Sequence, residues 1–260
     1  MNGDGLILLT FVFARVAGLV LVAPIYGGAA VPMQVRGLFA AGLTLLVAPS
    51  QWHAKPVAFD GSLEYLGLLG VEAILGACLG LGVLILMHGM TLAGELIGRL
   101  SGLGIAEALD PDLNEDVPQF SRLLFLTALC VFLCIGGHRM VMAGLLDTFQ
   151  AMPPGGGLLP STLADRLTTL VSQSFSLGIR AAAPTLAALL VATLTLGLVG
   201  RTMPQLNLLA MGLGLNAMLA FAVLAFSLGA AVWVFQGQIE PAMETILDSL
   251  KTPLQSQWMS

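Results

Sequence analysis

The residues of this chain best able to do chemistry are charged side chains that lie in or beside long apolar stretches. There are seven of them: Arg15, Glu72, Glu95, Arg99, Arg122, Arg180 and Arg201. A charge at the centre of a lipid bilayer costs roughly 2.5–3.5 kcal/mol, so seven unpaired charges together would exceed an ordinary folding free energy. These side chains must therefore pair, reach the polar interface, or contact water.

The sequence offers a nearby partner to only some of these charges. Glu95 and Arg99 lie four residues apart, in the order that favours an ion pair along a helix. Arg15, Arg122 and Arg180 have no acid close by in the sequence, so their partners are distant in this chain, on neighbouring subunits, or water in a channel. For Arg122 and Arg201, extension of the side chain to the interface from a helix end is an alternative. For Arg15 and Arg180, which lie within apolar runs, we favour neighbouring subunits as the source of the partner charge.

Other reactive residue types do not form a recognisable site. His53, His88 and His138 are isolated, with no Cys, Asp or Glu at metal-ligand spacing within one element. Cys78, Cys130 and Cys134 lie in apolar runs, where thiols are usually core residues, and their odd number gives no disulfide framework. Phosphate-binding loops and nucleophile elbows are absent. The sequence therefore predicts no enzyme activity, no cofactor and no metal site.

The composition predicts an integral membrane protein. Hydrophobic residues make up 57% of the 260 residues and charged residues 10%, and the mean hydropathy is +0.93. Soluble domains are about a quarter charged. The formal net charge of −5, without a basic stripe, argues against a nucleic-acid partner. The first apolar run lacks a basic leader and a cleavage signal, so we expect it to be retained as a helix.

Uneven apolar runs, separated by Pro and Gly, predict helical hairpins with kinked and broken helices. The runs cover about 6–23, 35–48, 63–103, 119–135, 140–150, 165–199 and 206–235. The third run is too long for one crossing and predicts a bent pair or a long helix that leaves the bilayer. We expect an all-α polytopic membrane domain over 1–260, assembled with neighbouring subunits. It comprises an N-terminal part (1–152), a flexible Pro/Gly hinge (153–160) and a C-terminal hairpin region (161–260).

Glycines recur on helix faces at spacings of four residues. One face carries Gly76 and Gly80, and a second carries Gly94, Gly98 and Gly102. A face without Cβ atoms lets another backbone approach closely, which favours helix association in membranes. The partner is a helix of the same chain or one of another subunit.

A small secondary transporter is the alternative from a different functional class. Pro184 and Pro204 could break helices, and Asn207 and Asn216 could supply polar groups near the membrane midplane. The two halves of the chain, however, are not alike, and no pair of broken segments occupies matching positions.

Several short motifs follow one another in a distinctive order along the chain. The N-terminal half contributes Phe13-Ala14-Arg15, Ala23-Pro24-Ile25, Val31-Pro32, Gly94-Glu95-Leu96-Ile97-Gly98 and Asp110-Pro111. Then follow Gly136-Gly137-His138, Asp147-Thr148-Phe149, Pro153-Pro154-Gly155-Gly156, Ala183-Pro184 and Arg201-Thr202-Met203-Pro204-Gln205-Leu206-Asn207. In this order the motifs resemble the FliR family, the flagellar type III export-gate proteins called SctT in injectisomes.

This resemblance implies a structural, pore-forming subunit of a gate that conducts unfolded export substrates across the inner membrane during flagellum assembly. It implies FliP-like and FliQ-like neighbours, FlhB-like and FlhA-like export components, and a place in the flagellar basal body. Injectisome members share the same motifs, so the equivalent subunit of a virulence injectisome is a further alternative.

The resemblance also assigns a role to the segment that follows the glycine-rich helix. In the family this segment forms a plug loop that closes the pore. Its residues here are Leu103, Gly104, Ile105, Ala106, Leu109, Asp110 and Pro111. Family plugs commonly carry Met and Phe, whereas these side chains are small or aliphatic, so sealing would depend on backbone, Leu and Ile contacts.

Overall fold

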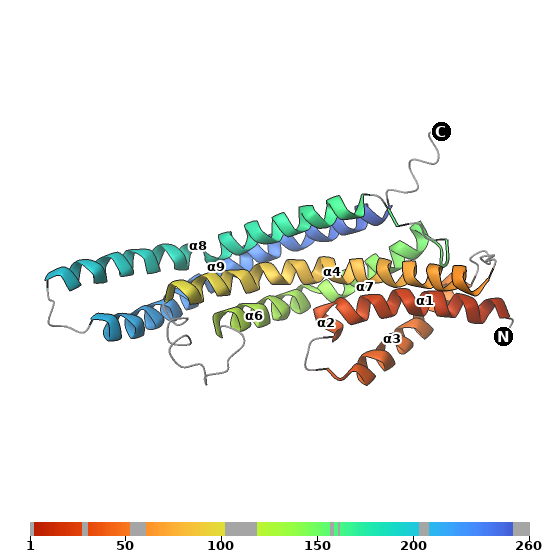
Figure 1. Ribbon diagram of the computed structural model, residues 1–260, viewed down its shortest axis with the longest axis horizontal. Coiled ribbons are helices and arrows are strands. Elements are labelled where there is room, and N and C mark those ends of the chain that lie inside the picture. The colour runs from red at the N-terminus through yellow and green to blue at the C-terminus, as the bar shows by residue number, and fades with distance from the viewer. Residues whose placement is uncertain are drawn as a thin grey trace. The chain divides into compact units, whose positions relative to one another are not determined.

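The computed structural model describes residues 3–27, 31–52, 61–101, 119–156, 159–160, 162–202 and 208–251. Every element in these ranges is a helix. The order is α1 (Gly3–Val22), α2 (Pro24–Gly27), α3 (Met33–Val47), the short 3₁₀ helix η1 (Ala48–Gln51), α4 (Ser62–Ser101), α6 (Gln119–Ile135), α7 (Gly137–Ala151), α8 (Leu163–Thr202) and α9 (Leu208–Lys251) (Figure 1). Five helices are long and apolar enough to cross a membrane, or up to six candidate spans if α6 and α7 count as one broken span. The predicted all-α polytopic fold is confirmed.

The chain folds into two compact units, each built from segments far apart in the sequence. Unit 1 comprises Met1–Leu86, Ile135–Val171 and Glu240–Ser260, and unit 2 comprises Met87–Cys134 and Ser172–Ile239. Each unit therefore contains residues from before and from after the Pro/Gly segment 153–160. The long helices α4, α8 and α9 each run from one unit into the other.

The three long helices continue through positions where the sequence suggested interruptions. The run predicted as a bent pair or one long helix is a single helix, α4. Pro184 lies inside α8, and Pro241 lies inside α9, which continues to Lys251. A proline removes one helical hydrogen bond and crowds the preceding turn, so packing must offset this cost. Beyond Pro241, Ile246 packs at Gly82 of α4, inside unit 1.

Glycine ends α6 and starts α7. Gly136 has a φ of +86°, in the left-handed region that glycine occupies without strain. Its carbonyl oxygen accepts the backbone N–H of Arg139 at 2.8 Å, in the first turn of α7. The predicted stop at Gly136–Gly137 is confirmed.

In unit 1, α1 lies directly against α4 because glycines face the partner backbone. A Cβ on Gly76 would overlap the carbonyl oxygen of Arg15, and a Cβ on Gly18 would overlap that of Ala73. One turn beyond Gly76, a Cβ on Gly80 would come within 2.9 Å of the Ala23 nitrogen. Gly76 and Gly80 therefore pack inside the chain, so of the two alternatives the partner of this face is a helix of the same chain.

In unit 2, glycines again let backbones meet. A Cβ on Gly178 of α8 would stand 2.7 Å from the carbonyl oxygen of Gly89 in α4. A Cβ on Gly94 would stand 2.5 Å from the carbonyl group of Phe120 in α6. Gly94 therefore also packs inside the chain, Gly98 is buried, and Gly102 lies outside the described residues.

We expect Gly94→Ala to destabilise unit 2 by about 2 kcal/mol, because the added methyl group must push the start of α6 away. Gly197→Ala is the matched control, since a Cβ at Gly197 meets nothing within 4 Å. Thermal unfolding of the purified protein in detergent measures both variants. Equal melting temperatures for the two would contradict the close α4–α6 contact.

Candidate functional site: a buried charged centre

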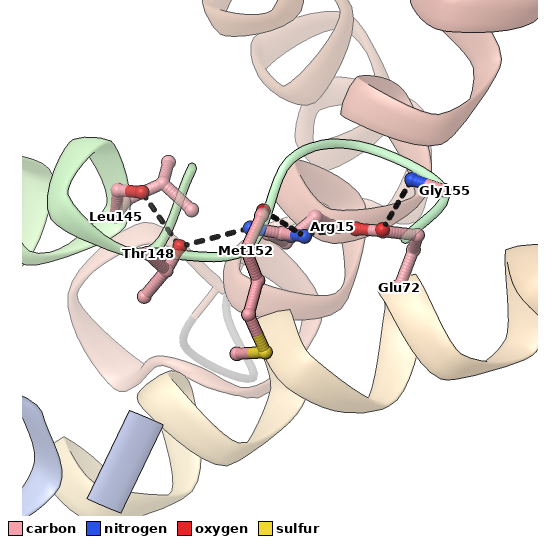
Figure 2. Close-up of polar contacts among 6 residues, drawn as sticks. All are labelled: Arg15, Glu72, Leu145, Thr148, Met152 and Gly155. Atoms are coloured by element: carbon pink, nitrogen blue, oxygen red, sulfur yellow. Dashed lines mark hydrogen bonds and ion pairs between the residues drawn. The ribbon is translucent and has the colours of Figure 1, made fainter. Parts of the chain in front are cut away.

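Arg15 of α1 is completely buried and uses three of its nitrogens. Its Nε donates to Oε2 of Glu72 in α4 at 2.6 Å, and neither side chain has any exposed area. Its Nη1 donates to Oγ1 of Thr148 at 3.3 Å, and Nη2 donates to the carbonyl oxygen of Met152 at 3.1 Å (Figure 2). All the partners belong to unit 1. The counter-charge of Arg15 is thus Glu72, which lies 57 residues away in the same chain.

Glu72 is satisfied on both carboxylate oxygens. Oε2 faces Arg15, and Oε1 accepts the backbone N–H of Gly155 at 2.8 Å (Figure 2). Gly155 has a φ of +81°, which glycine adopts at little cost. A side chain on α4 therefore holds the start of the Pro/Gly segment in place. The interpretation of 153–160 as a flexible hinge does not apply to this residue.

Helix α7 supplies the remaining walls of the centre. The hydroxyl of Thr148 donates to the Leu145 carbonyl at 2.7 Å, which turns its oxygen lone pairs toward Arg15. The guanidinium carbon of Arg15 lies 4.3 Å from the centroid of the Phe149 ring, a cation–π contact. Met152 follows the last residue of α7, where the helix dipole is negative and a cation is favoured.

This arrangement joins α1, α4, α7 and the start of the α7–α8 connection through one neutral pair of charges. The charges balance, and the structure gives a hydrogen-bond partner to each carboxylate oxygen and each guanidinium nitrogen. A packing that separated the two side chains while they stayed buried would leave each charge without its partner, at a cost of several kcal/mol, roughly 3–5. We therefore name Arg15, Glu72, Thr148, Met152 and Gly155 the buried charged centre.

A second contact holds the N-terminal end of α7 in unit 1. The hydroxyl of Tyr26 in α2 donates to the carbonyl oxygen of His138 at 3.0 Å. Burial raises the pKa of Tyr26 to about 12, so the hydroxyl keeps its proton and can donate at physiological pH. The Tyr26 ring also stacks on Phe39 of α3, with centroids 5.5 Å apart.

The other predicted charges lie on the surface of the chain. Glu95 and Arg99 form the expected ion pair along α4 and are exposed by 39% and 74%. Arg122, Arg180 and Arg201 are exposed, and none forms an ion pair with another described side chain. The plug segment from Leu103 to Pro111 lies outside the described residues.

Two expectations from the sequence need correction. The preference for a neighbouring subunit as the partner of Arg15 is wrong, because Glu72 meets it within the chain. Cys130 and Cys134 are exposed rather than core residues, and only Cys78 is buried. Among the described residues, no group of three or more His, Cys, Asp or Glu could hold a metal ion.

The sequence did not identify Thr148, Met152 and Gly155 as partners of the charged pair. Thr148 and Gly155 belong to motifs that carried the family resemblance, and this was the only available signal. Nothing in their spacing from Arg15 links them, since the contacts to Thr148 and Met152 close loops of 133 and 137 residues.

Comparison with known proteins gives consistent matches along the chain. Residues 6–242 match a sequence model of bacterial export proteins, family 1. The flagellar biosynthetic protein FliR of Escherichia coli (strain K12) is 32% identical over 81% of this chain and 80% of its own length. The corresponding FliR of Bacillus subtilis (strain 168) is 26% identical, over 92% and 93%. The secretion system apparatus protein SsaT of Salmonella typhimurium is 26% identical, over 86% and 88%.

The match over residues 6–242 includes the buried charged centre and the segments that carried the resemblance. The chain therefore belongs to the FliR family of bacterial export proteins.

Proposed function

We propose that this chain is a structural subunit that lines and closes the conduit of the flagellar type III export gate. It is a multi-pass inner-membrane protein of the flagellar basal body and a component of the flagellar export apparatus. In the proposal it has no catalytic activity, assembles with FliP-like and FliQ-like subunits, and works with FlhB-like and FlhA-like components to pass unfolded export substrates. The family match over residues 6–242 is the observation that carries this proposal.

The end of α4 supports a contact with water near the proposed plug. Glu95 and Arg99 form an exposed ion pair in the last two turns of α4, which ends at Ser101. An exposed ion pair is costly to place in the hydrocarbon core of a bilayer. This end of α4 is therefore better placed against water or a polar partner than against lipid chains. The segment 103–111 follows directly, which fits a loop that enters an aqueous conduit.

The buried charged centre supports a structural rather than a catalytic role. Its charges are paired and shielded from solvent, so they cannot exchange protons with a substrate without opening unit 1. What they can do is hold α1, α4 and α7 in one arrangement. A gate needs such a frame so that a loop at its end can open and close reproducibly.

Deletion of 105–109 tests the plug role. We expect the assembled complex to form, and the inner membrane to become leaky to small ions, because side chains that seal the conduit are lost. Ion flux into vesicles or cells that carry the complex measures the effect. Replacement of the same five positions by a Gly/Ser sequence of equal length shows whether side chains or chain length provide the seal. Unchanged conductance in both variants would reject the plug.

Co-purification separates the gate from the transporter alternative. The gate requires stable association with FliP-like and FliQ-like proteins and loss of motility on gene deletion, without solute uptake. A transporter would purify alone or as a homo-oligomer and bind a small molecule. Pro184, which that alternative used as a helix break, lies within the continuous helix α8.

A virulence injectisome is the second candidate system. The similarity to SsaT, named as a secretion system apparatus protein, favours it. The E. coli FliR match at 32% identity favours the flagellum. Complementation of a strain that lacks its flagellar FliR distinguishes the two: restored swimming supports the flagellar assignment.

A further inference from the structure

The part of α8 that belongs to unit 2 carries a short row of polar side chains that ends at Arg180. Gln173, Ser176 and Arg180 follow one another at spacings of three and four residues, so they lie on one face of the helix. All three are at least partly exposed. Arg180 is the only charged residue between Arg166 and Arg201. The row is therefore an exception on an otherwise largely apolar helix.

Arg180 finds no counter-charge in the described part of unit 2. The single acidic residue there is Glu95, which is already paired with Arg99. Pro184, one turn further along α8, has no N–H group, so the backbone carbonyl of Arg180 also lacks its usual helical donor. Arg180 therefore brings an unpaired charge and a carbonyl without its helical donor to the same place.

The amide of Gln173 has a polar atom without a partner as well. Although the residue is partly exposed, its Oε1 is buried and accepts no hydrogen bond from any described residue. A buried polar atom without a partner is costly and uncommon in native structures. The terminal torsion of a glutamine turns easily, so the amide can reach a neighbour on the outer face. The row thus contains two groups, at Gln173 and at Arg180, that the described part of this chain leaves incomplete.

Neither lipid nor water suits the surroundings of Arg180. Lipid chains would enclose an arginine without a counter-charge, which is costly in the hydrocarbon core. Water would cover large apolar side chains that are 47% to 62% exposed on both sides of Arg180, namely Phe175 and Ile179 before it and Leu190, Val191 and Leu194 after it. Arg180 therefore does not mark an edge of the apolar surface. A protein surface that is apolar around one acidic side chain suits both the charge and its surroundings.

Small side chains beside Arg180 leave room for another helix. Ala183 and Ala187 continue the line of Ser176 and Arg180, again at spacings of three and four residues, and both alanines are exposed. Small residues let the backbones of neighbouring membrane helices approach closely, and hydrogen bonds between polar side chains then add to the packing. The same face therefore offers close approach and polar groups to be paired.

We propose that this face of α8, defined by Gln173, Ser176, Arg180, Ala183 and Ala187 and named the Arg180 face, is an interface that receives a helix of a neighbouring subunit. That helix carries an aspartate or glutamate at the level of Arg180, a hydrogen-bond donor near Gln173, and apolar or small residues against the two alanines. The interface rests on the proposed function in requiring a neighbouring subunit. It adds which surface that subunit covers and which chemistry it presents.

Replacement of Arg180 by Gln tests the interface in the complex assembled with FliP-like and FliQ-like subunits. We expect the amount of these subunits that co-purifies with the chain to fall roughly tenfold or more, because loss of one partner of an interfacial ion pair speeds dissociation. The melting temperature of the purified chain alone should not change, since Arg180 is exposed there. Arg201→Gln is the matched control on the same helix, because Arg201 is also exposed, and it should co-purify as the wild type does.

The possible results separate the interface from the proposed function. Normal co-purification of Arg180→Gln would overturn the interface and leave the export-gate assignment in place. Failure of the wild-type chain to bind these subunits would reject the proposed function, and the interface with it. An equal loss of stability in the chain alone would mean that the counter-charge lies within this chain, in the acidic segment 107–116, and would overturn the interface.

A photo-crosslinker at Ala187 gives a second measurement, which does not depend on removing the charge. Benzoylphenylalanine at this position should form a cross-linked product with a FliP-like or FliQ-like subunit in the assembled complex. The same probe combined with Arg180→Gln should give several-fold less product. A product with an exported protein would mean that the face lines the conduit, and the absence of any protein product would mean that it faces lipid. Either result would overturn the interface.

Discussion

Replacement of Glu72 by Gln should be strongly destabilising, although it changes only the carboxylate of one side chain into an amide. Gln keeps the size of the side chain and an oxygen for the Gly155 N–H, but leaves Arg15 buried without a counter-charge. Removal of one partner from a buried ion pair costs about 3–5 kcal/mol. We expect a sharp fall in melting temperature in detergent, a lower amount of protein in the membrane, and loss of swimming.

The double variant Arg15→Met with Glu72→Gln separates charge from packing. Both side chains are then neutral, so most of the lost stability should return, although Thr148 and the Met152 carbonyl lose a donor. Arg99→Gln is the matched control, because it breaks an exposed pair along one helix that contributes about 0.5 kcal/mol or less. If Glu72→Gln melts at the wild-type temperature, the pair does not hold unit 1 together.

Gly76→Ala should give the second large effect, through backbone contact rather than charge. The added Cβ would overlap the carbonyl oxygen of Arg15, so α1 and α4 must move apart. Overpacking costs typically 1–3 kcal/mol and occasionally more. Because both sides of this contact are backbone, which cannot turn aside as a side chain can, we expect about 3 kcal/mol or more. Unfolding in detergent and the yield of assembled complex measure it.

Gly70→Ala is the control on the same helix. A Cβ at Gly70 meets nothing within 4 Å, so the change should be neutral or stabilise by up to about 1 kcal/mol, since alanine favours helix. Equal losses of stability in Gly76→Ala and Gly70→Ala would contradict the close contact between α1 and α4, because only Gly76 lies at that contact.

The contact of Gly76 with α1 and the Arg15–Glu72 ion pair share the same residue, Arg15. Gly76 lies against the backbone of the residue whose side chain meets Glu72, only one turn of α4 away. A shift of α1 by Gly76→Ala should therefore also lengthen the Arg15–Glu72 contact. The double variant Gly76→Ala with Glu72→Gln should therefore lose less stability than the sum of the losses in the two single variants. The reason is that neighbouring residues that share a contact are coupled.

The sequence by itself determined the class of the protein, most of its helices and its family. Apolar runs of these lengths can satisfy their backbone in lipid only as helices, so α6 was predicted at Gln119–Ile135 with the observed bounds. The left-handed Gly136 ended it as expected, because few residues other than glycine take that conformation readily. The Glu95–Arg99 pair was also predictable, since it depends only on helical spacing.

Only the tertiary structure decided the partners of the distant groups. The contacts of Arg15 with Glu72, Thr148 and Met152 depend on how α1, α4 and α7 fold back on one another, and nothing in local spacing encodes that. The same holds for Gly76 and Gly94, whose faces could have met any helix but meet α1 and α6. Local geometry repeats along a sequence and can be recognised there, whereas the pairing of helix faces is set by the packing of the whole chain.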